Sequence, residues 1–349
     1  MSRALRGLLV GAGFFAGNHL HAWAATEGAT LVGVADLDGD RAEAAARAFG
    51  LPHHGRDAAK LARAISPDFV DIVAPAPSHL PLVRALAAPG RLLICQKPLA
   101  GDLAEARELV ATAEAAGAAL LVHENFRWQS PFRDLVAKLR EGRLGRIAFA
   151  LFAFRHGYDN YVNQPYLARI ERFAIADVGT PLFDLAQLTC GSALSVSAQT
   201  QRRNPQVRGE DSFVAMARHV DDAQSVVEAS FESRLTPHRF PQTLATVEGS
   251  EGTWELGEDY RVTLHDADGR HAYGVEPPVP RWGGKPWHVV QDSVAALLAH
   301  AVAVARGDCL PRPSGAFTLG TVALVDAAYR SAASGRACAP EATCGGAGQ

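Results

Sequence analysis

The chain has 349 residues, of which 48% are hydrophobic and 20% are charged, and its formal net charge is −3. These values are typical of an ordinary globular protein of about two domains, and the near-neutral balance argues against nucleic acid or a membrane surface as a partner. No apolar stretch is expected to span a membrane, and the cysteines and histidines form no CxxC or zinc-type pattern. We therefore predict no metal site and a reducing, cytoplasmic location.

The first segment, GLLVGAGFFAGNHLHAWA at 7–24, has two interpretations. A basic start, an apolar run and Ala22-Trp23-Ala24 imitate a secretory signal peptide. However, Gly11, Gly13 and Gly17 interrupt that run, and cleavage would remove the first strand of the domain that follows. We therefore expect this segment to be the strand, turn and helix that open a nucleotide-binding domain.

The first 122 residues alternate between short β-branched runs and alanine-rich stretches. The apolar runs lie at 7–11, 30–36, 68–75, 91–98 and 118–124, and the helical stretches at 41–49, 79–88 and 103–116. Strands separated by helices of this length indicate βαβ units, and near-continuous apolar strands are typical of a parallel sheet covered on both faces. We predict a doubly wound parallel sheet, a Rossmann domain, over 1–122.

After about residue 125 the pattern becomes that of an α+β domain. The expected elements are helices at 131–141, from about 180, at 287–306 and at 316–332, and strands at 147–154, 212–220, 223–233, 242–250 and 253–257. Consecutive strands with short turns predict an open, largely antiparallel sheet, in a substrate-binding and oligomerisation domain over 123–333. The small, polar tail at 334–349 is predicted to be disordered.

A glycine-rich turn follows the first strand. Gly11-Ala12-Gly13-Phe14-Phe15-Ala16 matches G-x-G-x-x-G/A, in which the second glycine lets the backbone approach a pyrophosphate and the helix N-terminus attracts the phosphates. Asp36 ends the next strand, where a carboxylate accepts hydrogen bonds from the adenosine ribose. Because Leu37-Asp38 supplies no arginine for a 2′-phosphate, the sequence favours NAD over NADP.

A lysine follows the apolar strand at 91–98, RLLICQKP. Ligands of open parallel sheets bind beyond the carboxyl ends of the strands, so Lys97 is predicted near the nicotinamide, where it would orient a hydroxyl and move its proton. A surface lysine before a loop is an equal alternative. The predicted cofactor-binding residues are Gly11, Gly13, Phe14, Phe15, Ala16, Asp36, Pro75, His79, Gln96 and Lys97.

Four motifs occur together and in order: Gly11–Ala16, Asp36, Lys97-Pro98 and the run Asp177-x-Gly179-x-x-x-x-Asp184. With them, the chain resembles the Gfo/Idh/MocA family of sugar and polyol oxidoreductases over about residues 5 to 335. The resemblance implies a Rossmann domain followed by an α/β domain whose open sheet often forms a dimer interface. It further implies NAD, a small sugar substrate, a homodimer or homotetramer, and Lys97 and Asp177 as catalytic residues.

Four further segments are similar to the branch of that family that oxidises D-apiose: HENFRWQ (123–129), 156–173, TQRRNPQVRGED (200–211) and PWHVVQDSV (286–294). This similarity implies NAD-linked oxidation of the branched pentose D-apiose at its anomeric carbon, giving a lactone. Two alternatives stay open. One is a glycoside hydrolase of the same family that uses bound NAD, and the other is a non-catalytic NAD-binding sugar sensor.

The run at 177–184 lacks a histidine that the family usually has. Family members commonly read D-x-G-x-H-x-x-D, with the histidine assigned to proton transfer, whereas this chain has Pro181 at that position. Thr180 is a predicted N-cap with Pro181 at the first helical position, so the proline is compatible with a helix. The groups that would replace the imidazole are Lys97, Asp177, His156 and His123, and the residues leave this choice open.

The candidate substrate contacts follow the strand at 118–124 or lie in the irregular segment before Asp177. A long segment without periodicity inside a compact domain is more often functional than idle. The alternative roles are an ion pair for Arg127 and packing for the tyrosines. The predicted substrate-binding residues are Glu124, Asn125, Arg127, Arg155, His156, Tyr158, Arg172 and Asp177.

Overall fold

The computed structural model describes residues 3–342, which divide into two compact units. The units are residues 3–124 with 294–319, and residues 125–293 with 320–342. This division differs from the predicted single boundary at 122/123, because the chain returns to the first unit once more before it ends in the second. The two crossing points lie within helices α8 (His288–Arg306) and α9 (Gly315–Ser334).

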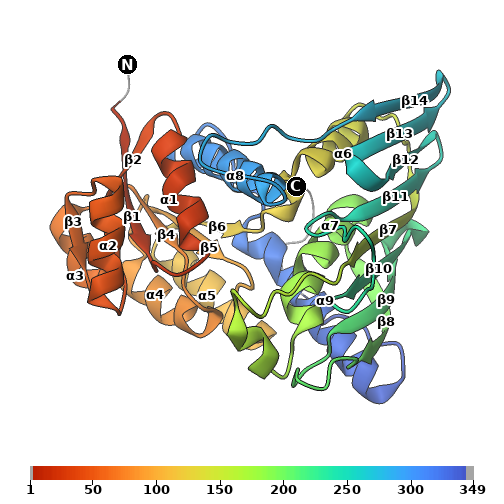
Figure 1. Ribbon diagram of the computed structural model, residues 1–349, viewed down its shortest axis with the longest axis horizontal. Coiled ribbons are helices and arrows are strands. Elements are labelled where there is room, and N and C mark those ends of the chain that lie inside the picture. The colour runs from red at the N-terminus through yellow and green to blue at the C-terminus, as the bar shows by residue number, and fades with distance from the viewer. Residues whose placement is uncertain (1–2, 343–349) are drawn as a thin grey trace. The chain divides into compact units, whose positions relative to one another are not determined.

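The first unit contains a six-stranded sheet in the order β3-β2-β1-β4-β5-β6 (Figure 1). Its strands are β1 (Leu5–Val10), β2 (Ala29–Ala35), β3 (His53–Gly55), β4 (Phe69–Ile72), β5 (Leu92–Gln96) and β6 (Ala119–His123). Its helices are α1 (Ala16–Ala25), α2 (Gly39–Phe49), α3 (Ala58–Ile65), α4 (His79–Leu86) and α5 (Leu103–Ala115). Every neighbouring pair of strands is parallel, which confirms the predicted Rossmann fold. The strand order reverses between β1 and β4, where doubly wound sheets bind nucleotides.

The apolar character of β5 determines which side chains reach the sheet edge. Leu93, Ile94 and Cys95 are fully buried, as expected for a central strand covered on both faces. The apolar run stops at Gln96, so Gln96 and Lys97 are the first side chains of this strand that are partly exposed.

The second unit contains an eight-stranded sheet in the order β14-β13-β12-β11-β7-β10-β9-β8. Its strands are β7 (Ile147–Arg155), β8 (Ala193–Gln201), β9 (Ser212–His219), β10 (Gln224–Ser230), β11 (Leu244–Gly249), β12 (Gly252–Leu256), β13 (Arg261–Asp266) and β14 (Gly269–Gly274). Only β7 and β10 are parallel, and the other neighbouring pairs are antiparallel, which confirms the predicted open, largely antiparallel sheet. The unit also contains helices α6 (Ser130–Arg140) and α7 (Thr180–Cys190).

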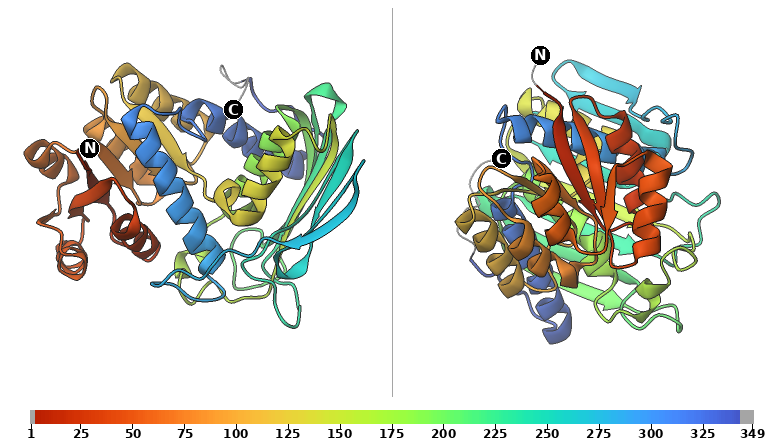
Figure 2. Two further views of the ribbon diagram at one scale, coloured as in Figure 1. Left: turned by 90° about the horizontal axis from the view of Figure 1, so that it is seen from above. Right: turned by 90° about the vertical axis from the view of Figure 1, so that its left-hand side faces the viewer.

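The two faces of this sheet differ. On β7, Phe152 and Phe154 alternate with Leu151, Ala153 and Arg155; the phenylalanines are buried and the other three are partly exposed. Helix α7 packs on the phenylalanine face, against β7 and β10. In the left view of Figure 2, the opposite face carries no helix of the described chain. We call these the helix face and the outer face.

Two further expectations concern α8 and the C-terminal tail. Helix α8 is long and apolar enough to cross a membrane by length and composition alone, although more than half of it is buried, and a core helix passes the same test. The tail predicted to be disordered is partly ordered, because Cys338 and Val196 exchange two backbone hydrogen bonds of 2.9 and 2.8 Å. The remainder of that tail, 343–349, lies outside the described residues.

Candidate functional site

The two glycines of the loop differ in the space that a side chain would find. Gly11 has φ +99°, and a Cβ there would lie 2.2 Å from the Val73 carbonyl oxygen, so only glycine fits. A Cβ at Gly13 would meet no atom within 4 Å. The backbone at Gly13 therefore borders open space where α1 begins, which fits the pyrophosphate of a dinucleotide.

Asp36 follows β2 with its carboxylate turned to this loop. One oxygen accepts the Ala12 N–H at 2.7 Å, and the other accepts the Asp38 N–H at 2.8 Å. Two backbone donors therefore hold the carboxylate beside the loop, at the strand end where a ribose-binding aspartate is expected.

Arg41, from the first turn of α2, places its Nη2 atom 3.2 Å from Asp36 Oδ1. An arginine therefore lies near Asp36, although Leu37-Asp38 supplies none. The helical turn after Asp38 brings Arg41 back beside Asp36.

At the end of β5, a buried polar chain supports Lys97. Gln96 Oε1 accepts the Lys97 N–H at 2.7 Å, and Gln96 Nε2 lies 3.5 Å from His19 Nε2, at the long end of hydrogen bonding. His19 Nδ1 contacts Asp71 Oδ2 at 2.8 Å, and the same oxygen accepts Trp23 Nε1–H at 2.7 Å. His19, Trp23 and Asp71 did not appear among the predicted site residues. Their only signal in the sequence is a polar residue inside an apolar run.

Two other histidines of the first unit are completely buried. Both ring nitrogens of His79 contact backbone carbonyls, of Leu99 at 3.0 Å and Ala74 at 2.8 Å. His79 thus ties two strand-end loops together, and its predicted contact with the cofactor stays a prediction. His123 ends β6 and packs on His19 with ring centroids 4.3 Å apart. Burial, and then the charges of His19 and Lys97, hold the pKa of His123 well below its usual value.

In the second unit, Arg127 and Asp184 form a buried ion pair. Arg127 Nε and Nη2 donate to the two Asp184 oxygens at 2.8 and 2.6 Å, and the side chains are 5% and 1% exposed. Burial raises the pKa of Asp184, and the two bonds from Arg127 oppose that shift. Of the two roles considered for Arg127, the structure supports the ion pair, which fastens the turn at 126–128 to α7.

Asp177 lies in a short π-helical turn, Ile175–Gly179, that runs directly into α7. The Thr180 hydroxyl donates to the Ala176 carbonyl at 2.7 Å. Thr180 is therefore not the predicted N-cap. Its hydroxyl satisfies the carbonyl five residues before Pro181, which a π-helix would pair with the N–H that proline lacks. Asp177 itself is partly exposed.

His156 lies in an aromatic cage. The rings of Phe154, Phe231 and Phe240 surround it at centroid distances of 4.9 to 5.0 Å, and its Nδ1 accepts the Tyr158 N–H at 3.1 Å. Burial lowers the pKa of His156 to about 4; nearby His238 adds to the shift and Asp177 opposes it. The imidazole is therefore neutral and fully buried.

The remaining predicted substrate-binding residues are dispersed. Tyr158 stacks on Phe240 at 4.4 Å, and the Asn125 amide donates to Ser293 Oγ at 2.8 Å. Glu124, in the first unit, is almost fully buried. Arg172 pairs with Asp326 and covers the Tyr329 ring at 4.1 Å.

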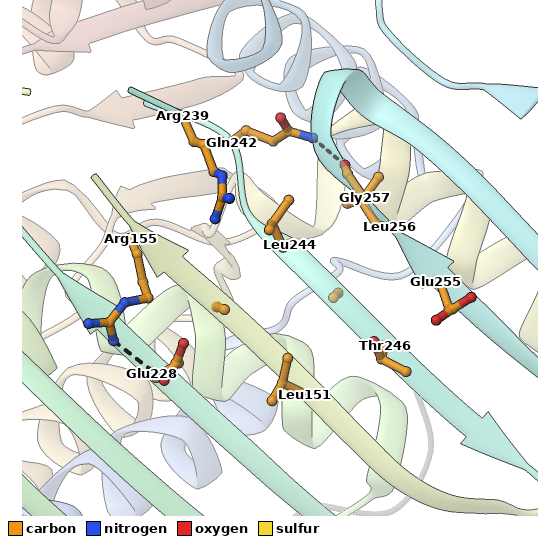
Figure 3. Close-up of a pocket in the computed structure, with 12 residues that line it drawn as sticks. Leu151, Arg155, Glu228, Arg239, Gln242, Leu244, Thr246, Glu255, Leu256 and Gly257 are labelled. Carbon is orange, nitrogen blue, oxygen red and sulfur yellow. Dashed lines mark hydrogen bonds and ion pairs between the residues drawn. The ribbon is translucent and has the colours of Figure 1, made fainter. Parts of the chain in front are cut away.

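Arg155 lies on the outer face of the sheet, opposite the face on which α7 packs. It lines a pocket of about 360 Å³ with Leu151, Arg239 and Leu244, and it pairs with Glu228 at 3.4 Å (Figure 3). Because side chains of a strand alternate in direction, Arg155 and Phe154 cannot face the same site. Among residues 3–342 no group of three or more His, Cys, Asp or Glu side chains is arranged to hold a metal.

Comparison with known proteins identifies the family of the chain. Residues 5–124 match the profile of an oxidoreductase family with an NAD-binding Rossmann fold, and residues 132–255 match the GFO/IDH/MocA C-terminal domain. The chain is 42% identical to a D-apiose dehydrogenase of Paraburkholderia graminis, over 96% of this chain and 89% of that protein. It belongs to the Gfo/Idh/MocA family.

Other relatives agree with this assignment. A D-apiose dehydrogenase of Rhizobium rhizogenes is 39% identical over 95% of this chain and 96% of its own length. A solved oxidoreductase from Agrobacterium radiobacter, in complex with NAD+, L-tartaric acid and magnesium, has a TM-score of 0.93 and 39% identity. That likeness covers 96% of this chain and 98% of the other. As a family member, the chain is an NAD-dependent oxidoreductase.

Proposed function

We propose that this enzyme oxidises D-apiose, or a closely related aldose, at its anomeric carbon with NAD. The reaction is aldose + NAD+ → lactone + NADH + H+. The observation that carries the proposal is the 42% and 39% identity to two D-apiose dehydrogenases over nearly the whole chain. The nucleotide loop supports it, since Gly13 is open and Asp36 is held by backbone donors.

NAD, when bound, accepts the hydride from the anomeric carbon. The protein has to orient the sugar and take the hydroxyl proton. Of the four groups considered for that proton, His123 and His156 are fully buried, whereas Lys97 and Asp177 are partly exposed. A group that touches the substrate must be reachable, so we propose Lys97 and Asp177 as the catalytic residues. An anomeric hydroxyl is more acidic than an ordinary alcohol, which lessens the demand for the histidine that Pro181 replaces.

The test measures NADH formation by absorbance with purified protein, NAD and a panel of pentoses and hexoses that includes apiose. We expect turnover on apiose, reduced at least about 100-fold by Lys97→Ala and by Asp177→Asn, because a placed acid–base group typically contributes ~10² to 10⁴ in rate. Turnover on another aldose alone would refute the apiose assignment. Cleavage of a glycoside without net NADH would support the hydrolase alternative, and NAD binding without any turnover would support the sensor.

We also propose a homo-oligomer in the cytoplasm, as a dimer or tetramer that uses the outer face of the eight-stranded sheet. On β9, Val214 and Met216 are 45% and 54% exposed, and large apolar side chains that stay half exposed on an open sheet mark an interaction surface. In the described residues Cys95, Cys190, Cys309 and Cys338 are free thiols, which suits a reducing compartment. Light scattering on Met216→Glu, which should yield monomer, tests the interface.

A further inference from the structure

The helical segment that carries Asp177 begins without a capping side chain of its own. No side chain of its N-terminal residues caps the π-turn at 175–179, and the first regular bond is from the Asp177 N–H to the Phe173 carbonyl, at 2.8 Å. The four preceding N–H groups, of residues 173–176, therefore need partners from elsewhere.

Glu210 supplies three of these partners. One side-chain oxygen, Oε1, accepts the N–H groups of Phe173 and Ile175 at 3.2 and 3.0 Å. Its backbone carbonyl accepts the Ala174 N–H at 3.0 Å. A carboxylate at this end of a helical segment also interacts favourably with the helix dipole.

Tyr329, from α9, supplies the fourth. Its hydroxyl accepts the Ala176 N–H at 3.1 Å and donates to Glu210 Oε1 at 2.7 Å. Burial and the nearby Glu210 charge raise the pKa of Tyr329, so the hydroxyl keeps the proton that it donates. All four unpaired N–H groups are thus satisfied by two residues distant in sequence.

Arg172 completes this arrangement. Its guanidinium covers the Tyr329 ring at 4.1 Å and pairs with Asp326, one turn earlier on α9. This contact holds the Tyr329 ring against the segment that contains Asp177. Arg172, which the sequence predicted to bind substrate, thus has structural partners on α9.

We propose that Glu210 and Tyr329 are positioning residues for Asp177. They determine the residue at which the helical segment begins and, with it, the direction of the Asp177 side chain. Asp177 is the first residue whose N–H bonds within the segment, so a start displaced by one residue would change its backbone conformation and redirect its side chain. The proposal rests on the proposed function in one respect, namely that Asp177 acts in catalysis.

The test is Tyr329→Phe, which keeps the ring under Arg172 and deletes only the hydroxyl. We expect kcat to fall about 10- to 100-fold, the scale of a catalytic group displaced by about 1 Å. KM for NAD should stay within twofold, and amide hydrogen exchange at Ala176 should accelerate. Glu210→Gln keeps an oxygen acceptor and should retain most of kcat, whereas Glu210→Ala should lose it.

The matched control is Tyr273→Phe. The Tyr273 hydroxyl donates to Asp134 Oδ2 at 2.9 Å, in the same unit but away from Asp177. The Tyr273→Phe variant should leave kcat unchanged, while its loss in the free energy of unfolding should be similar to that of Tyr329→Phe. Equal kcat values for Tyr329→Phe and Tyr273→Phe, in folded protein with normal NAD binding, would overturn the proposal. If Asp177→Asn retains full activity, the catalytic role proposed for Asp177 fails and this proposal with it, while hydrogen exchange at Ala176 still reports whether Tyr329 holds the segment.

Discussion

Arg127 and Asp184 meet through two hydrogen bonds of 2.8 and 2.6 Å, in surroundings that leave their side chains only 5% and 1% exposed. Asp184 is the last aspartate of the run at 177–184, and its partner Arg127 is a residue that the sequence predicted to bind sugar. Both oxygen atoms of the Asp184 carboxylate accept a hydrogen bond from Arg127. The pair therefore connects a turn at the start of the second unit with the helix that follows Asp177.

Removing one partner of this pair should be strongly destabilising. Asp184→Asn or Arg127→Leu would leave a buried group unpaired, and we expect a loss of about 3–5 kcal/mol in the free energy of unfolding, measured by urea denaturation. The exposed pair Arg84 and Glu108 is the control. Arg84→Ala should cost less than about 1 kcal/mol. A small effect of Asp184→Asn would show that the pair is dispensable.

Acid should destabilise the second unit through His156. The pKa of His156 is about 4 in the folded protein and about 6.5 in the unfolded chain. Above pH 6.5 the imidazole is neutral in both states, and its burial has no protonation cost. As the pH falls from 6.5 to 4 the unfolded chain takes up the proton first, and roughly 3 kcal/mol of stability is lost.

His156→Phe should flatten this part of the stability profile, measured as the urea midpoint between pH 4 and pH 7. His79 and His123, whose pKa values are also lowered by burial, contribute in the same direction and will remain in the variant. An unchanged slope in His156→Phe would mean that His156 is not held neutral.

The two loop glycines should respond differently to alanine. Gly13→Ala meets no protein atom, so stability without cofactor should change by less than about 0.5 kcal/mol, while NAD affinity falls at least about tenfold. Gly11→Ala would place a methyl group 2.2 Å from the Val73 carbonyl at φ +99° and should destabilise the protein itself. Thermal melts with and without NAD separate the two effects. Unimpaired NAD binding by Gly13→Ala would contradict this view of the loop.

Asp36 should determine the choice of nicotinamide cofactor. Asp36→Ala removes charged hydrogen bonds to the ribose, each worth about 1.5–3 kcal/mol, so kcat/KM for NAD should fall about 10- to 100-fold. Use of NADP should rise, because the repulsion of its 2′-phosphate is lost and Arg41 stays close by. The double variant Asp36→Ala/Arg41→Ala should lose this gain. If NADP use is the same in both variants, Arg41 plays no part in cofactor choice.

Local pattern was sufficient for the fold class of both domains and for the glycine loop, but not for the return of the chain to the first unit between α8 and α9. The alternation of apolar and alanine-rich stretches indicated the Rossmann unit, and the spacing from Gly11 to Asp36 indicated the nucleotide, since strand ends and the turns after them are set by neighbouring residues. Even Lys97 could be placed, because the apolar strand before it ends where burial ends.

The arrangement around Asp177 could be decided only by the tertiary structure. Glu210 and Tyr329 are 119 residues apart, and Arg127 and Asp184 are 57 apart; no periodicity relates the members of either pair. Only the tertiary structure shows, too, which face of β7 is covered by α7 and therefore that Arg155 points away from the side on which Phe154 lies. A buried hydrogen bond depends on which elements pack together, and that packing is determined by the burial of the whole chain and not by the residues beside each partner.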